Sequence, residues 1–142
     1  MTGVDCNILV QLAFADHPVH AKTAVAVDAE TNAGITLAIP ALVITEFLHV
    51  STDPRRFKFP LTMMEAEDWV QELLADSSVR IIEGSESSLK QTLSWMRQHK
   101  LGRKRILDTH LTSILYTSGV RRLLTSNPDD FSVFGVLDLV IP

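Results

Sequence analysis

The sequence has a single cysteine, no long apolar run and a small net charge, and each of these shortages excludes a class of protein. Because Cys6 stands alone, the chain can form neither an internal disulfide nor a zinc site built from several cysteines. No apolar run approaches the roughly 20 residues that span a bilayer, and the first residues lack the basic and apolar segments of a secretory signal. We therefore expect a cytoplasmic protein that has no membrane partner.

The basic residues are unevenly placed along the chain. A net charge of −4 excludes the large positive field of a general polyanion binder. Five of the thirteen lysines and arginines nevertheless lie in one stretch, RQHKLGRKR, and a second basic group follows Asp53 and Pro54. Taken alone, clusters of this kind are most often solvated loops.

Short apolar strands alternate with helical segments along the whole sequence. A strand is expected to end at Val4, and further strands are expected within 35–40, 79–84, 120–125 and 136–142, with helices between them. Such alternation produces βαβ units, which require a mostly parallel sheet covered on both faces. The sequence therefore predicts an α/β fold, a three-layer α/β/α sandwich, and the absence of repeats or linkers predicts a single domain over residues 1–142.

Several helices carry start signals. Thr62 and Glu65 form a capping box, Pro40 breaks a strand and opens a helix, and Ser85 is expected to cap another helix. One helix is predicted to begin near His17 and to end near Gly34. Its histidines, His17 and His20, have no third partner, so we do not expect them to form a metal site. The inner face of each helix, meaning the side expected to pack on the core, is Ala21, Ala24, Val25 and Ala29 in this helix. In the helix after Ser85 it is Leu89, Leu93 and Met96.

Four acidic residues stand where a solvated side chain is not expected. Asp5 ends the first strand, and Glu46 lies in the apolar stretch IPALVITEFLHV. Asp108 begins an apolar helix, and Asp130 comes soon after the strand that ends in LLT. A buried carboxylate is unfavourable unless it is paired, protonated or bound to a cation. Each acid alone fits a helix cap or a surface contact, but four on different elements indicate a shared divalent cation, Mg²⁺ or Mn²⁺.

The segments that contain these acids are VDCN, TEFLHV, LDTHLTS and LLTSNPDDF, and in order and spacing they resemble the four motifs of the PIN-domain nucleases, particularly the VapC-type toxins. The intervening HPVHAKTA and TDPRRFKFPLT, and the final FSVFGVLDLVIP, are similar to that family as well. Each motif by itself is only an acid among apolar residues, but the ordered set covers nearly the whole chain. The resemblance implies a PIN fold, with a central parallel sheet between helices and an acidic cluster at the strand ends.

The resemblance also assigns positions to the acids. Asp5, Glu46 and Asp108 match the three most regular acids of the family, as metal ligands or water-positioning groups. Asp130 matches the fourth acid in the T-x-N-x-x-D-F form of the last motif, and Asp129 stays an alternative for it.

The neighbours of the acids fit the family pattern with two departures. Asn127 is an amide where a shorter form of the last motif has an acid, so it is expected to support the site, as is Thr125. Asn7 is placed either to cap the first helix or to orient Asp5. Cys6 stands where small hydroxyl residues or alanine are usual, and we expect its thiol to pack as a small apolar group.

The activity that the resemblance implies is Mg²⁺- or Mn²⁺-dependent RNA cleavage that leaves a 5′-phosphate and a 3′-hydroxyl, by a homodimeric toxin that a cognate antitoxin silences. No residue would act as a covalent nucleophile, since the metal would activate water. The basic stretches would hold the RNA backbone on either side of the cut, although Arg97 and Lys100 also fit a simple interaction with a helix C-terminus. The candidate RNA-binding residues are Arg55, Arg56, Lys100, Arg103, Lys104 and Arg105.

Two other interpretations of the sequence compete with this one. A catalytically idle PIN-like module that binds RNA or a protein partner stays open, because Asn127 and Cys6 depart from the family pattern. A phospho-receiver domain would need an acidic pair after the first strand and a lysine late in the chain. The sequence disfavours it, since Asp5 has no acidic neighbour and no lysine follows Lys104.

Overall fold

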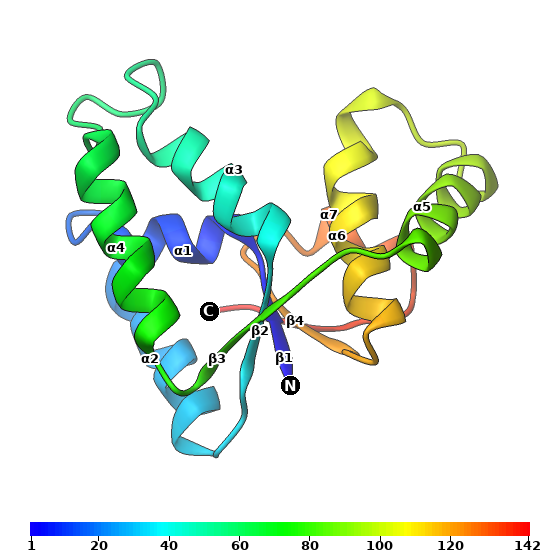
Figure 1. The fold of residues 1–142 in the computed structure, drawn as a ribbon, viewed down its shortest axis with the longest axis horizontal. Coiled ribbons are helices and arrows are strands. Elements are labelled where there is room, and N and C mark those ends of the chain that lie inside the picture. The colour runs from blue at the N-terminus through cyan, green and yellow to red at the C-terminus, as the bar shows by residue number, and fades with distance from the viewer.

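The computed structural model describes residues 1–142 and has one five-stranded sheet at its centre. Every strand pair is parallel, and the strand order is β3-β2-β1-β4-β5 (Figure 1). The carboxyl ends of all strands therefore meet at one edge, as in the predicted α/β sandwich. The strands are β1 (Thr2–Val4), β2 (Leu37–Pro40), β3 (Val79–Ile82), β4 (Arg122–Leu124) and β5 (Asp138–Val140).

The helices form the two outer layers of the molecule (Figure 1). On one side of the sheet lie α1 (Cys6–Ala13), α2 (His20–Asn32), α3 (Ala41–Ser51) and α4 (Met63–Ala75). On the other side lie α5 (Glu86–Gln98), the 3₁₀ turn η1 (Arg103–Arg105), α6 (Ile106–Thr117) and the short α7 (Asp129–Ser132), which the sequence did not predict. No helix combines the length and the apolar character that a membrane crossing needs.

Local signals explain where several helices begin. The Thr62 hydroxyl accepts a hydrogen bond from the Glu65 backbone N–H (3.1 Å), and the Glu65 carboxylate accepts one from the Thr62 N–H (3.0 Å). Ser85 caps α5 in the same reciprocal way with Ser88, at 3.1 and 2.8 Å. These bonds satisfy backbone donors that the first helical turn leaves without partners. Both predicted caps are confirmed.

The core fills the space between the central strands and the helices on each side. Its largest fully buried side chains include Phe47 on α3 and Leu115 on α6. Gly3 on β1 has no room for a side chain, because a Cβ atom would come within 2.7 Å of both methyl carbons of Leu115. The middle strand therefore lets α6 approach closely, which brings the first turn of α6 toward the carboxyl end of β1.

Two predicted inner faces are wrong. Helix α2 begins at His20, and Val25 is 69% exposed, while Thr23 and Glu30 are the buried residues of that helix. The reason is that both polar side chains find hydrogen-bond partners inside. In α5 the exposed face carries Leu89 and Leu93, and the buried residues are Ser88, Thr92 and Trp95.

Glu30 connects three elements at the end of the sheet opposite the carboxyl edge. Its carboxylate accepts a hydrogen bond from the Thr2 hydroxyl on β1 (2.5 Å) and an ion-paired one from Arg122 on β4 (2.8 Å). Removing this carboxylate leaves both partners without their acceptor. Because Arg122 is partly exposed, the loss is smaller than for a fully buried pair.

We expect Glu30→Ala to lower the free energy of unfolding by about 2 kcal/mol, measured by urea denaturation. Glu67→Ala is the matched control, because Glu67 is exposed on α4 and should change the value by less than about 0.5 kcal/mol. Equal effects of the two substitutions would show that the Glu30 network contributes nothing to stability.

Candidate metal centre

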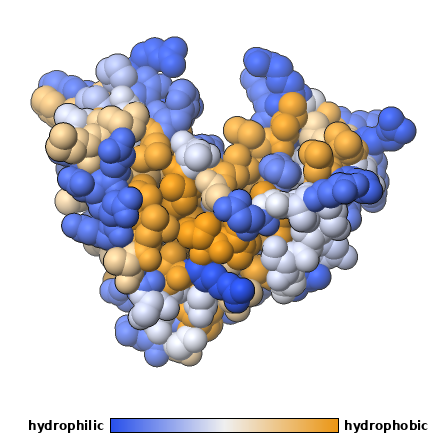
Figure 2. Space-filling view, in the orientation of Figure 1, coloured by the Kyte–Doolittle hydropathy of each residue, from blue (hydrophilic) through white to orange (hydrophobic).

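A cavity of about 430 Å³ lies at the carboxyl edge of the sheet. Asp5, Glu46, Asp108 and Asp130 all line it, although they are far apart in the sequence. In the space-filling view the molecule is hollowed between the helices of its two sides (Figure 2). The structure thus brings together the four acids that the sequence singled out.

Asp5 is the most firmly held of these acids. Its backbone N–H donates to the Leu124 carbonyl (3.1 Å), so its position follows directly from the pairing of β1 with β4. The carboxylate oxygen Oδ2 accepts hydrogen bonds from the Thr125 hydroxyl (2.6 Å) and from the Asn7 amide (2.7 Å). Asp5 makes no side-chain cap on α1. Asn7 therefore orients Asp5 and does not cap the helix.

The turn after β4 is fixed to α1 by side-chain hydrogen bonds. The Thr125 hydroxyl accepts from the Asn127 N–H (3.0 Å), and the Asn7 amide oxygen accepts from the Ser126 N–H (3.2 Å). Gln11 donates to the Ser126 hydroxyl (2.9 Å) and accepts from Thr23 on α2 (2.7 Å). Sequence reasoning missed Gln11, for which the available signal was a second amide, one turn after Asn7, within an otherwise apolar helix.

The other three acids reach the cavity from separate helices. Glu46 lies near the middle of α3, between buried residues that pack that helix on the core, and Asp108 lies in the first turn of α6. Asp130 lies in α7 and lines the cavity, whereas Asp129 is exposed and is not part of its lining. Of the two candidates for the fourth acid, only Asp130 faces the other three.

Burial and mutual repulsion shape the electrostatics of the cavity. Burial raises the pKa of Asp5, which is only 8% exposed, and the hydrogen bond from Thr125 opposes this effect. Burial also raises the pKa of Glu46, and the charge of Asp5 adds to it. The pKa of Asp108 rises to about 6 because of burial, then because of the charges of Asp130 and Asp5. The carboxylates therefore act on one another across the cavity.

Two arginines partly balance this charge. Arg56 lines the cavity and lowers the pKa of Glu46, against the larger effect of burial. The Arg105 guanidinium donates to the backbone carbonyl of Asp130, and its Nε atom lies 3.8 Å from the Asp108 carboxylate. Arg105 thus connects α7 to the start of α6, a role that its place in a basic run did not suggest.

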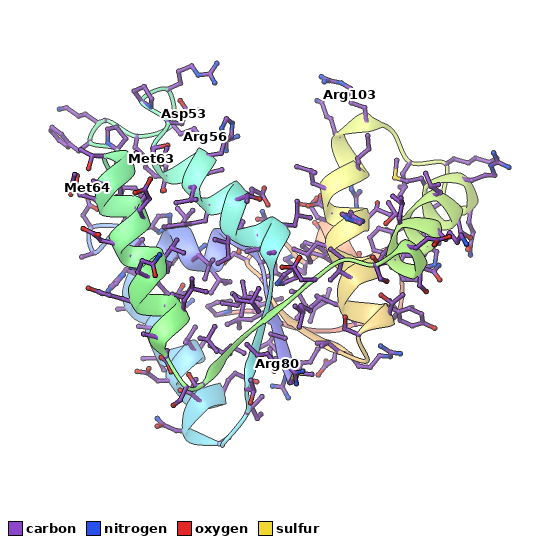
Figure 3. The ribbon with its side chains drawn as sticks, in the orientation of Figure 1. Asp53, Arg56, Met63, Met64, Arg80 and Arg103 are labelled. Atoms are coloured by element: carbon purple, nitrogen blue, oxygen red, sulfur yellow. The ribbon has the colours of Figure 1, made fainter.

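The remaining basic candidates lie in two segments, the loop between α3 and α4 and the segment before α6. Arg55 and Arg56 both pair with Asp53, at 3.2 and 3.7 Å, but Arg55 is 84% exposed and does not line the cavity. Lys100, Arg103 and Lys104 are exposed in the segment before α6. Figure 3 shows Arg56 and Arg103 on opposite sides of the hollow.

The cysteine and the histidines do not extend the acidic set. Cys6 is buried, and burial raises the pKa of its thiol far above the usual range, so it packs as a neutral group. The His20 ring donates to the Gln11 carbonyl (2.9 Å), and the His17 ring accepts from the Val19 N–H (3.3 Å). His110 pairs with Thr92 on α5 (2.9 Å) and is not part of the cavity lining.

The donor set fits a hard divalent cation. Four carboxylates and a single arginine line the cavity, so the charges left uncompensated are negative and all belong to oxygen ligands. No three His, Cys, Asp or Glu side chains are close enough to one another to hold one ion directly. Mg²⁺ commonly binds through only one or two carboxylates and keeps several waters, a mode of binding that this spacing suits.

Comparisons with known proteins agree with this geometry. No curated protein sequence matches the chain. Among solved structures, VapC20 of Mycobacterium tuberculosis is 16% identical with a TM-score of 0.73, and each chain covers 100% of the other. VapBC2 of Rickettsia felis, crystallised with a DNA fragment of its promoter, is 19% identical over 99% of this chain and 97% of that one, with a TM-score of 0.70.

A toxin–antitoxin complex from Klebsiella pneumoniae is 18% identical over 99% of this chain and 96% of that one, with a TM-score of 0.62. At these identities the three structures establish a shared fold. The sequence model of the PIN domain matches residues 4–136, which include all four acids of the cavity. The chain therefore belongs to the PIN domain family, as the order of its acidic motifs predicted.

Proposed function

We propose that this protein is a Mg²⁺- or Mn²⁺-dependent endoribonuclease whose site is the acidic cavity. The observation that carries the proposal is that Asp5, Glu46, Asp108 and Asp130, from four elements, line one cavity at the carboxyl edge of a parallel sheet. Functional residues gather at this edge in open α/β sheets. The proposal rests further on membership of the PIN domain family.

The chain's own residues would prepare the site for hydrolysis. A bound Mg²⁺ or Mn²⁺ would lower the pKa of a water molecule and offset negative charge on the phosphate. Asp5 is held by Thr125 and Asn7 in one orientation, so little ordering remains when a ligand binds. Asp108 and Asp130 are kept near each other by Arg105. The hydroxyls of Thr125 and Ser126 in the turn are engaged with Asp5 and Gln11, so we assign no covalent nucleophile.

The basic residues around the hollow would bind the RNA backbone. Arg56 on one side and Arg103 on the other are placed to contact phosphates on either side of the cut (Figure 3). Arg105 would act differently, since its guanidinium is already engaged with α6 and α7. The proposed backbone contacts are Arg55, Arg56, Lys100, Arg103 and Lys104.

The biological setting we propose is a toxin–antitoxin pair. VapC20 is a sarcin-ricin loop cleaving toxin, and the structure from Klebsiella pneumoniae is a toxin–antitoxin complex. By likeness to them, RNA would be the substrate and a cognate antitoxin the protein partner. A homodimer stays a prediction, for which the exposed leucines of α5, Leu89 and Leu93, offer an apolar face.

A catalytically idle PIN-like module remains the second candidate. Asn127 favours it, because an amide stands at a position where some members have an acid. Incubation of purified protein with structured RNA, with and without Mn²⁺, separates the two. Absence of metal-dependent cleavage, together with undetectable Mn²⁺ binding, would leave the idle module as the function.

We expect Asp5→Asn and Asp108→Asn each to reduce Mn²⁺-dependent RNA cleavage at least about a hundredfold, since even groups that only support metal ligands contribute about 10- to 100-fold. An amide keeps the shape of the side chain, so circular dichroism should show an unchanged fold. Asp68→Asn, at an exposed position of α4, should cleave at the parent rate.

The fourth acid is tested by a matched pair at neighbouring positions. Asp130→Asn should lose activity as Asp108→Asn does, whereas Asp129→Asn should keep most of it, because only Asp130 lines the cavity. The same assay measures both. A larger loss from Asp129→Asn would assign the fourth position to Asp129.

The raised pKa of Asp108 predicts a pH-dependent stability in the absence of metal. The folded-state pKa is about 6 against an ordinary 3.8, so between these values the folded protein takes up a proton that the unfolded chain does not. Ionised Asp108 therefore destabilises the fold above pH 6, and stability returns as the pH falls toward 4. Asp108→Asn removes this effect.

With EDTA present, Asp108→Asn should be more stable than the parent at pH 8 by about 2 kcal/mol, and the difference should shrink as the pH falls through 6. Urea denaturation across this range provides the measurement, with Asp68→Asn as the control. A difference that does not vary with pH would mean that neither burial nor the neighbouring carboxylates destabilise ionised Asp108.

A further inference from the structure

A second, smaller cavity of about 210 Å³ adjoins the acidic one. His17 and Phe57 line both cavities, so the two share a wall. The smaller cavity is strongly aromatic, because Phe14, Phe57 and Phe59 contribute to it and these are half of the chain's six phenylalanines. None of the roles assigned so far uses this cavity.

Two stacked rings form the inner wall of the aromatic cavity. The rings of Phe14 and Phe57 are stacked, with centroids 4.3 Å apart and planes 8° from parallel. Phe14 is buried after α1, and the Phe57 N–H donates to the Asp53 carbonyl (3.2 Å). Asp53 in turn pairs with Arg56, which reaches into the acidic cavity. The loop between α3 and α4 is thus held in place by contacts at both cavities.

Phe59 forms the outer wall and is 76% exposed. The Lys58 ammonium lies 5.4 Å from the centroid of the Phe59 ring, so a positive charge accompanies the exposed aromatic face. An aromatic ring beside a cation is the combination by which proteins bind single-stranded nucleic acid, the ring stacking on a base and the cation contacting the backbone. A surface that made only apolar contacts with a partner would have no use for the charge of Lys58.

The polar groups of the cavity suit the edge of a base. Asp16 and His17 line it beside the three rings. A carboxylate accepts hydrogen bonds from the exocyclic amino groups of adenine, cytosine or guanine, and uracil has no such group.

We propose that the aromatic cavity binds one unpaired base of the RNA, next to the phosphate held at the acidic cavity, with the base stacked on Phe59. Lys58 contacts the backbone, and Asp16 favours a base that carries an amino group. This inference rests on the proposed ribonuclease function, and it adds a contact that selects the nucleotide beside the cut. Unpaired bases stacked on aromatic side chains are the usual route to sequence preference in RNA recognition.

Equilibrium binding tests the inference without requiring cleavage. The probe is a single-stranded RNA of random sequence with 2-aminopurine in place of adenine, whose fluorescence falls when the base stacks. The parent protein should quench this fluorescence, and Phe59→Ala should bind about tenfold more weakly and quench little. Phe59→Trp should retain binding, whereas Phe59→Leu, which keeps only apolar contact, should behave like Phe59→Ala.

Met64→Ala is the matched control. Met64 is 72% exposed on α4, lies on the side of that helix away from the hollow, and lines neither cavity (Figure 3). It should bind and quench as the parent does. Cleavage kinetics give a second readout, in which Phe59→Ala raises KM about tenfold and leaves kcat within about twofold, because the stacking contact is the same in the bound substrate and in the transition state.

The outcomes separate this inference from the proposed function. RNA cleavage by the parent, with equal KM for Phe59→Ala and Met64→Ala and equal quenching, would overturn the stacking site and leave the ribonuclease intact. Quenching that depends on Phe59 without any cleavage would support the base site and contradict the nuclease. If Phe59→Ala loses only the binding of a protein partner and binds RNA normally, the cavity is a protein contact and the inference is wrong.

Discussion

Four carboxylates that face one cavity repel one another, and the surrounding structure opposes this repulsion with fixed contacts. Asp5 is held by two hydrogen bonds from side chains of α1 and of the turn after β4. Arg105 connects the elements that carry Asp108 and Asp130. Glu46 is positioned by the burial of Phe47 and Val43 on the same helix. The repulsion that remains would be relieved by a bound cation, which is why we propose a metal ion for this cavity.

The parallel sheet is what makes this convergence possible. β1 lies in the middle of the sheet and pairs with β2 and β4, so the residues that follow these strands meet at one edge. Asp5 follows β1, Thr125 follows β4, and α3 with Glu46 begins directly after β2. Residues more than 100 positions apart are thereby neighbours. The fold supplies the positions, and the side chains at the strand ends supply the chemistry.

Much of this was predictable from the sequence because the relevant signals are local. Neighbouring residues are enough to recognise the capping box of Thr62 and Glu65 and the apolar strands. They are also enough to show that an acid such as Glu46 is unusual in an apolar stretch. What failed depends on tertiary partners. Glu30 is buried because Arg122 lies beside it, 92 residues away, and no local pattern indicates that pair. The α5 helix buries Thr92 and exposes Leu93 because the Thr92 hydroxyl pairs with the His110 ring on α6 (2.9 Å), which removes the penalty for burying it.

The measurement that tests the central idea most directly is a crystal structure of the protein soaked in Mn²⁺, with the anomalous signal of manganese used to locate the ion. We predict a peak inside the acidic cavity that contacts the carboxylates of Asp5 and Asp108, directly or through water. A saturating soak that places manganese only elsewhere, or nowhere, would contradict the assignment of this cavity as a metal centre.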